Sequence, residues 1–164
     1  MTEIRVVTRI RAPPERCFNL ARSIDMHVAS ASQTGEKAVG GVTSGLINLG
    51  QSVTWEATHF GVRQRLTSVI TAFESPHFFQ DEMTEGGFAS FVHDHIFESA
   101  ASMTTMTDVV RFTAPMGLLG KLSERLLLAG YLERFIAKRG EAMKQVAESH
   151  TWKQYLLGNE KTAG

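Results

Sequence analysis

Cysteine is almost absent from this sequence of 164 residues, in which Cys17 is the only one. A single cysteine excludes an intrachain disulfide and any metal site built from several thiolates. The neighbours Phe18 and Leu20 are apolar, so we expect Cys17 to be an inert thiol in the core.

An excess of charge is also lacking. The 17 Lys and Arg residues balance the 17 Asp and Glu residues, and no basic stripe with interleaved aromatic residues is present. Because proteins that bind a phosphate backbone carry such an electrostatic footprint, no nucleic-acid partner is expected.

Long hydrophobic runs are missing as well. Residues 1–5 lack the charged start and apolar run of a signal peptide, and no segment reaches the roughly 20 apolar residues that span a bilayer. We therefore expect a soluble, cytoplasmic protein with no membrane span. The sequence has 43% hydrophobic residues and no internal repeat, so we predict a single domain over residues 1–157 and a flexible tail over 158–164.

One long amphipathic segment lies near the C-terminal end. Its apolar residues recur at steps of three and four, which places them on one face of a helix. We predict a helix from Leu118 to Ser149. Because glycine weakens helices, we expect a kink or break at Gly120, Gly130 or Gly140. The apolar stripe consists of Leu118, Leu122, Leu126, Ala129, Leu132, Ile136, Met143 and Val146.

The N-terminal part predicts one strand and two short helices. Residues 4–10 alternate between apolar and polar side chains, which predicts a strand with one buried face. Proline is tolerated in the first turn of a helix, so Pro14–Ala21 is predicted as a short helix, with Asp25–Ala29 as a second. In the glycine-rich region 35–50, the apolar patch Leu46–Leu49 predicts a weak strand.

The clearest hairpin covers residues 53–70 and turns at Phe60-Gly61. A two-residue turn fixes the register, which places Trp55 inside and an ion pair between Glu56 and Arg65 outside. The predicted pairs are His59 with Val62, Ala57 with Gln64, Trp55 with Leu66, and Val53 with Ser68.

A further strand is expected over His77–Glu82. Successive residues of a strand face opposite sides, so either Asp81 or Glu82 points inward, but not both. The pattern leaves this choice open.

The last predicted hairpin carries most of the polar chemistry. Phe91, His93, His95 and Phe97 share one strand face, the chain turns over residues 99–103, and residues 104–113 return. With Phe97 opposite Thr104, His93 lies opposite Asp108. Two histidines and one carboxylate then face the helix. The same register sets His95 opposite Met106 and Phe91 opposite Val110.

These elements predict an α+β fold in which a curved antiparallel β-sheet wraps around the long C-terminal α-helix, with two short helices after the first strand. In this arrangement the sheet and the long helix both bury their apolar faces. Space left between sheet and helix would be a ligand cavity.

The order of elements resembles the START-like, or SRPBCC, helix-grip superfamily over nearly the whole chain. Residues 10–18, with the sequence IRAPPERCF, are similar to its opening strand-to-helix phrase, and residues 91–98 are similar to its penultimate strand. Asp108 with Pro115-Met116-Gly117 resembles the last strand and its exit into the helix. The chain departs from the pattern at residues 102–105, where many members turn through glycine.

The resemblance implies an apolar cavity and does not select a reaction. The superfamily includes lipid and hormone carriers, coenzyme Q-binding proteins, polyketide aromatase/cyclases and co-chaperone-like proteins, and fold alone does not choose among them. The chain is most similar to the bacterial branch labelled polyketide cyclase/dehydrase-like.

Two interpretations of the polar residues stay open. His93 could act as a general base oriented by Asp108, with His95 or His59 as the acid partner, because histidine titrates near neutral pH. Alternatively, the His93–Asp108 pair only satisfies two buried polar groups. A metal set in which Asp108 or His59 completes His93 and His95 has weak support from spacing alone, so we assign no metal site and no cofactor.

Our first functional hypothesis is the binding of a small hydrophobic ligand, which could be a lipid, an isoprenoid or quinone, or an aromatic polyketide-like molecule. The alternative is a cyclase or dehydratase that uses the histidine and aspartate pair, and the sequence leaves open whether any reaction is catalysed. The expected lining residues are Trp55, His59, Leu66, Ile70, Phe91, Phe97, Met106, Val110, Leu132 and Ile136.

A third hypothesis is a protein-interaction module. Leu126, Leu127 and Leu128 cannot all face the sheet, so a Leu127/Leu128 edge and the segment Trp152–Leu157 could contact another chain, and a homodimer stays open.

Overall fold

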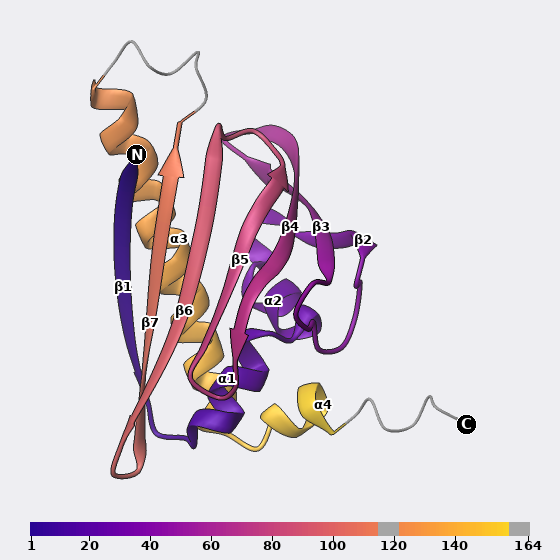
Figure 1. The fold of residues 1–164 in the computed structure, drawn as a ribbon, viewed down its shortest axis with the longest axis vertical. Helices are drawn as coiled ribbons and strands as arrows, with labels where there is room; N and C mark the ends of the chain where they lie inside the picture. Colours follow the sequence, from indigo (N-terminus) through magenta and orange to yellow (C-terminus); the bar gives the residue numbers. More distant parts are fainter. Residues whose placement is uncertain (115–121, 158–164) are drawn as a thin grey trace.

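The computed structural model describes residues 1–114 and 122–157 and has the predicted helix-grip fold. Seven antiparallel strands form one open sheet in the order β1-β7-β6-β5-β4-β3-β2. The long helix α3 crosses the face of this sheet, with α1 and α2 beside it (Figure 1). The elements are β1 (Thr2–Ile10), α1 (Pro14–Ala21), α2 (Ile24–Ser30), the 3-10 helix η1 (Ser32–Thr34), β2 (Lys37–Gly41), β3 (Ser52–His59), β4 (Val62–Glu74), β5 (Phe78–Glu85), β6 (Ser90–Ala100), β7 (Met103–Thr113), α3 (Leu122–Ala147) and α4 (Trp152–Leu156).

Strand β1 is an edge strand with one buried face, as predicted. Ile4, Thr8 and Ile10 are buried on this face, and α3 packs against β1. The close approach depends on Gly140, because a Cβ atom there would lie 2.5 Å from Thr8 Oγ1. The absence of a side chain at this position therefore lets helix and strand meet.

The apolar stripe of α3 is confirmed in its central and C-terminal parts. Leu132, Ile136 and Met143 are buried. Leu126 was expected on this face but is 67% exposed, because the stripe turns toward the sheet only beyond this first part of the helix. The helix is continuous through Gly130 and Gly140, whereas Leu118 and Gly120 lie outside the described residues.

The two short helices are confirmed and build one core cluster with the sheet. Pro14 occupies the start of α1, and the Ser23 hydroxyl caps α2 by accepting a hydrogen bond from the Met26 amide. Phe18 of α1 is fully buried. Its ring makes edge-to-face contacts with Phe73, Phe79 and Phe97.

Cys17 is buried in the same cluster. Burial raises the pKa of its thiol to about 11. The side chain is therefore an unreactive part of the core, as expected.

The strand predicted at Leu46–Leu49 is wrong. The strand of this region is β2, which pairs with β3 and contains a bulge between Ala38 and Gly40. Ile47 is buried because its apolar side chain joins the core from a loop. The amide of Ile47 donates to the carbonyl of Arg22, so hydrogen bonds to the α1–α2 junction replace those of a strand.

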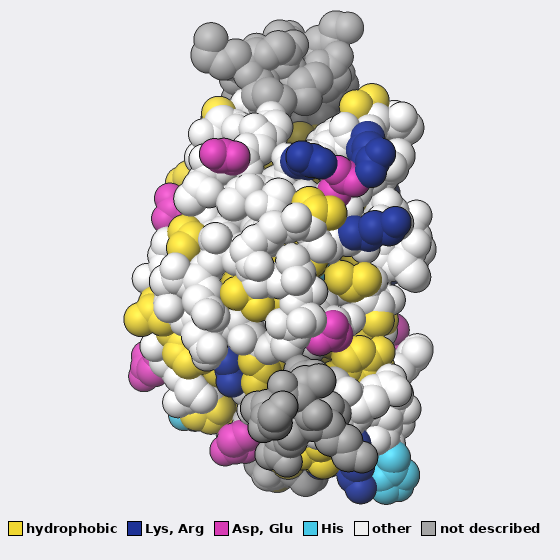
Figure 2. Space-filling view, turned by 90° about the vertical axis from the view of Figure 1, so that its right-hand side faces the viewer, with side chains coloured by type: hydrophobic (Ala, Val, Ile, Leu, Met, Phe, Trp, Pro, Cys, Tyr) yellow, Lys and Arg dark blue, Asp and Glu magenta, His cyan; other side chains and the backbone are white. Residues whose placement is uncertain are grey.

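The hairpin β3–β4 has the predicted register in every pair. Glu56 lies on the outer face, where both Arg63 and Arg65 contact its carboxylate. Glu56 itself is buried. Figure 2 shows the side of the molecule toward β2 and β3, where basic side chains gather around an acidic one and hydrophobic side chains appear in separate small areas.

The predicted register of the β6–β7 hairpin is wrong by two residues. Phe97 pairs with Met106, His95 pairs with Asp108, and His93 pairs with Val110. The turn contains only two residues, since Ala100 pairs with Met103, and Ala101 takes a left-handed conformation with φ of 56°. A shift of two residues preserves the inward face, so His93, His95 and Asp108 still meet.

The two segments proposed to contact another chain differ in how far they are exposed. Leu126 and Leu127 are exposed, whereas Leu128 packs against a core cluster. The segment after α3 forms α4, whose Trp152 packs against the chain's own core and carries the Arg16 guanidinium 4.3 Å above its ring. The predicted tail, residues 158–164, lies outside the described residues.

None of the described helices combines the length and the apolar composition that a bilayer crossing requires.

We predict that Gly140→Ala lowers the free energy of unfolding by about 1–2 kcal/mol, because the overlap with Thr8 outweighs the better helix propensity of alanine. Gly130→Ala is the matched control. A Cβ atom at this position would meet only the end of the flexible Arg134 side chain, at 3.5 Å. We therefore expect the free energy of unfolding of this variant to be about 0.5–1 kcal/mol higher than that of the wild type. Urea denaturation measures both.

The double variant Thr8→Ala/Gly140→Ala removes the overlapping hydroxyl. It is expected to be at least as stable as Thr8→Ala alone. If Gly140→Ala lowers the free energy of unfolding equally with Thr8 and with alanine at position 8, the contact with Thr8 does not limit helix packing.

Candidate functional site

The main cavity has a volume of about 160 Å³ and lies between two packed clusters of the core. One cluster is centred on Phe18, beneath α1 and α2. The other includes Val110, Phe112 and Leu132, where α3 meets the sheet. Both clusters contribute walls, so the cavity is the part of the interior that neither cluster fills.

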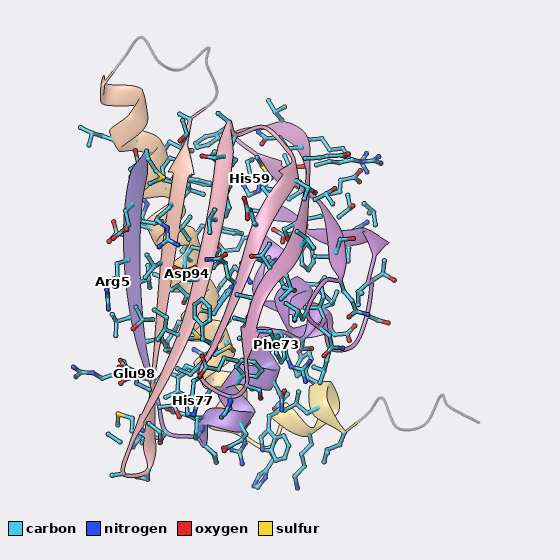
Figure 3. The ribbon with its side chains drawn as sticks, in the orientation of Figure 1. Arg5, His59, Phe73, His77, Asp94 and Glu98 are labelled. Carbon is cyan, nitrogen blue, oxygen red and sulfur yellow. The ribbon has the colours of Figure 1, made fainter. Side chains whose placement is uncertain are left out.

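Most of the predicted lining residues meet at this cavity. The predicted ligand-binding residues that line this cavity are Trp55, His59, Leu66, Ile70, Phe91, Leu132 and Ile136, and the predicted catalytic residues His93 and His95 line it as well. Figure 3 shows His59 toward the end of the sheet where β3 turns into β4, while Phe73 and His77 lie toward the other end.

Four predicted site residues lie outside this lining. Phe97 packs against Phe18, because α1 covers that part of β6. Val110 is buried in the cluster beneath α3. Met106 and Asp108 line a second, smaller pocket of about 30 Å³. The period of two predicted the correct face for these residues, but it could not predict how far α1 and α3 fill that face.

Two carboxylates enclose the paired histidines of β6. His93 Nε2 lies 2.9 Å from Asp108 Oδ1, and His95 Nδ1 lies 3.0 Å from the same oxygen. On the cavity side, Asp81 Oδ2 lies 3.1 Å from His95 Nε2 and 3.8 Å from His93 Nδ1. The two imidazole rings are 3.8 Å apart between centroids. Asp81, and not Glu82, is therefore the residue of β5 that faces inward.

The carboxylates set the charges of this group. Burial alone would lower the pKa of His95, but contacts with Asp108 and Asp81 raise it to about 9. Burial and the neighbouring His95 lower the pKa of His93. Burial acts to raise the pKa of Asp108, yet the two histidines outweigh it and the pKa is lowered. At neutral pH one histidine is therefore a cation and the other is neutral.

A second polar group, made of His27, Glu36 and Arg139, was not predicted. His27 is stacked on Trp55 with 3.8 Å between ring centroids. An Arg139 NH2 group donates to His27 Nδ1 at 2.6 Å, and His27 Nε2 donates to Glu36. A histidine held between a fixed donor and a carboxylate must be neutral, because Nδ1 serves as an acceptor.

Burial and the Arg139 charge lower the pKa of His27 to about 4. Burial acts to raise the pKa of Glu36, but His27 and Arg139 lower it. The group thus presents a charged guanidinium and a charged carboxylate, joined by a neutral imidazole, at the cavity wall.

One sequence signal could have revealed this second group. Arg139 follows Leu132 and Ile136 at helical spacing, so it is a cation within an apolar stripe. Such a residue needs a buried partner. His27 and Glu36 gave no comparable signal, since a short helix and a glycine-rich loop place them.

His59, the remaining polar residue of the predicted lining, is paired with the helix. Its Nδ1 lies 2.6 Å from the Tyr131 hydroxyl. Burial lowers the pKa of His59, so the neutral ring and the hydroxyl form a polar contact at the wall of the cavity.

A family model described as "Polyketide cyclase / dehydrase and lipid transport" matches residues 1–148. A comparison with curated proteins finds no match.

Solved structures show the same fold at low sequence identity. The protein TTHA0849 of Thermus thermophilus is similar with a TM-score of 0.70 and 18% identity, over 90% of this chain and 100% of that one. The ginseng major latex-like protein 151 of Panax ginseng has a TM-score of 0.64 and 13% identity, over 90% and 98%. The protein CV1439 of Chromobacterium violaceum has a TM-score of 0.64 and 12% identity, over 90% and 97%.

We predict that protonation of His27 destabilises the protein in acid. The pKa of His27 is lower in the folded than in the unfolded chain, so its stabilising effect is complete above about pH 6.5 and is lost as the pH falls toward 4. The loss amounts to about 3 kcal/mol at most. Urea denaturation between pH 7.5 and pH 4.5 measures it.

The control is His27→Gln, which keeps one acceptor for Arg139 and one donor for Glu36 but cannot be protonated. Residues remote from His27 are the same in both proteins, and the substituted amide keeps a hydrogen bond to Glu36, so the difference between the two profiles reports chiefly the protonation of His27. Parallel profiles over this range would contradict the assigned role.

Proposed function

Because the chain belongs to the polyketide cyclase/dehydrase and lipid transport family of the START-like helix-grip superfamily, we propose that it binds a compact hydrophobic molecule between the sheet and α3. The observation that carries this proposal is the cavity of about 160 Å³ between the two core clusters. Apolar and aromatic side chains from sheet and helix form most of its wall. A pocket of this composition favours apolar ligands.

The size of the cavity and the positions of its polar groups restrict the ligand. A cavity of about 150 Å³ accommodates a benzene-sized molecule, so one or two rings suit this one better than an extended lipid chain. Trp55 and Phe91 offer faces for stacking. His93 and Arg139 offer hydrogen bonds from two different walls. The proposed ligand is therefore an aromatic or alicyclic body with one or two oxygen substituents.

We predict that 2-naphthol, a two-ring phenol, binds with one molecule per chain and that Ala57→Phe weakens its binding at least tenfold. Ala57 is buried and lines the cavity, so a phenyl ring there occupies the ligand's space. Isothermal titration calorimetry measures affinity and stoichiometry.

Thr58→Phe is the matched control, because Thr58 is the next residue of β3 and is exposed. This variant should bind 2-naphthol like the wild type. Equal affinity of all three proteins would place the ligand outside the cavity and contradict the proposal.

One observation favours a second candidate, a cyclase or dehydratase-like proton transfer. His93 directs Nε2 to Asp108 at 2.9 Å, which leaves Nδ1 as the free acceptor of a neutral ring on the cavity side. A carboxylate behind an imidazole fixes the tautomer that a general base needs. In this candidate Asp108 orients His93, and His95 is the neighbouring acid.

The test uses 2-tetralone, a two-ring ketone with exchangeable C–H bonds beside its carbonyl group. If His93 is a base, the protein accelerates deuterium uptake measured by NMR, and His93→Gln reduces this acceleration by about 100-fold or more. His59→Gln removes a different cavity histidine and should retain it. Uptake at the buffer rate with the wild type would reject the candidate even if 2-naphthol binds.

A further inference from the structure

The geometry points to a divalent transition-metal site formed by Asp81, His93 and His95, with Asp108 holding the two imidazoles from behind. We infer a metal of the zinc or cobalt type. The three ligand residues come from the neighbouring strands β5 and β6, and one atom of each lies within 4.8 Å of the others.

The separations of these atoms suit a metal ion. Ligands about 2.0–2.2 Å from a tetrahedral Zn²⁺ lie roughly 3.3 Å apart. Asp81 Oδ2 is 3.1 Å from His95 Nε2 and 3.8 Å from His93 Nδ1. A small rotation of the Asp81 carboxylate would equalise these distances. The pairing Asp81↔His93 in the sheet holds the residues in place.

Asp108 supplies an independent argument. It contacts the other nitrogen of each ring, His93 Nε2 at 2.9 Å and His95 Nδ1 at 3.0 Å. Histidines that bind metals commonly direct their second nitrogen to a carboxylate, which fixes the ring and increases its basicity. Asp108 performs this task for His93 through a hydrogen bond, whereas His95 Nδ1 lies close to the same oxygen without the geometry of a hydrogen bond.

The balance of charge also favours a cation of charge +2. A metal bound at these atoms replaces the proton of His95, so both imidazoles are then neutral and the two carboxylates carry a net charge of −2 at a place where Asp108, His93 and His95 are buried. Buried charge is costly unless it is compensated. A divalent ion compensates both carboxylates at once, and two nitrogen ligands with one oxygen ligand suit zinc, cobalt, nickel or iron.

The site has an open side toward the cavity. Asp81, His93 and His95 line the main cavity, whereas Asp108 faces the smaller pocket. Three protein ligands leave at least one position for water or for an oxygen atom of a ligand. With a metal bound, His93 is a ligand and not a base. The inference is therefore distinct from the proton-transfer candidate and does not depend on ligand binding.

The test is a titration of the full chain with Co²⁺, followed by visible absorption, and equilibrium dialysis with Zn²⁺. We expect one ion per chain, the absorption bands of a low-symmetry Co²⁺ site, and their loss when one equivalent of Zn²⁺ is added. Asp81→Asn, His93→Gln and His95→Gln should each weaken binding at least 100-fold. Asp108→Asn, which leaves the ligands intact, should weaken it about 10–100-fold.

The matched control is His150→Gln on the surface, which should bind the metal like the wild type. Circular dichroism shows which variants remain folded. If a ligand variant does not fold, the inference is tested by the number of ions bound per wild-type chain and by the change in metal affinity that Asp108→Asn causes. No bound ion in the wild type, or unchanged affinity in the folded ligand variants, would overturn the inference.

Discussion

The structure depends on a mismatch of width between its sheet and its main helix. Seven strands spaced about 4.8 Å apart span roughly 29 Å, whereas a helix with its side chains is about 10 Å wide. Helix α3 can therefore cover only part of the inner face. Helices α1 and α2 cover another part around Phe18, and the uncovered remainder is the cavity.

The same mismatch explains why the interior contains polar residues. His93 and His95 lie on a strand face that would be apolar if α3 sealed it, and each requires a charged partner there. Asp81 and Asp108 provide these partners from the strands on either side. Arg139 of α3 also requires a partner in the interior, and it donates to His27, which in turn donates to the Glu36 carboxylate. The cavity thus combines apolar walls with two compensated polar groups on opposite elements.

Local periodicity predicted the elements whose residues alternate clearly. The β3–β4 register followed from the two-residue turn at Phe60-Gly61, because one turn length fixes every pair beyond it. The β6–β7 register was wrong, because Ala101 takes a left-handed conformation without glycine, and the turn is shorter than the sequence indicates. The strand predicted around Ile47 was wrong for a different reason, because a buried apolar patch in a loop has the same composition as a short strand.

The sequence predicted only those site residues whose positions follow from the pairing of neighbouring strands. His93, His95 and Asp108 meet despite the register error, since a shift of two residues keeps the face. The choice of Asp81 over Glu82, and the distances that separate a hydrogen-bonded pair from a metal site, depend on the β5–β6 alignment and the twist of the sheet. The contacts of His27 with Arg139 join residues more than 100 positions apart. No local pattern encodes such a contact.

The central claim is that the space between sheet and helix holds a small hydrophobic molecule. Native mass spectrometry of the freshly purified chain, followed by denaturing extraction, tests it most directly. The account predicts a mass above that of the bare chain and the recovery of a compact apolar compound with one or two rings. The bare mass alone, together with no binding of added two-ring compounds, would contradict it.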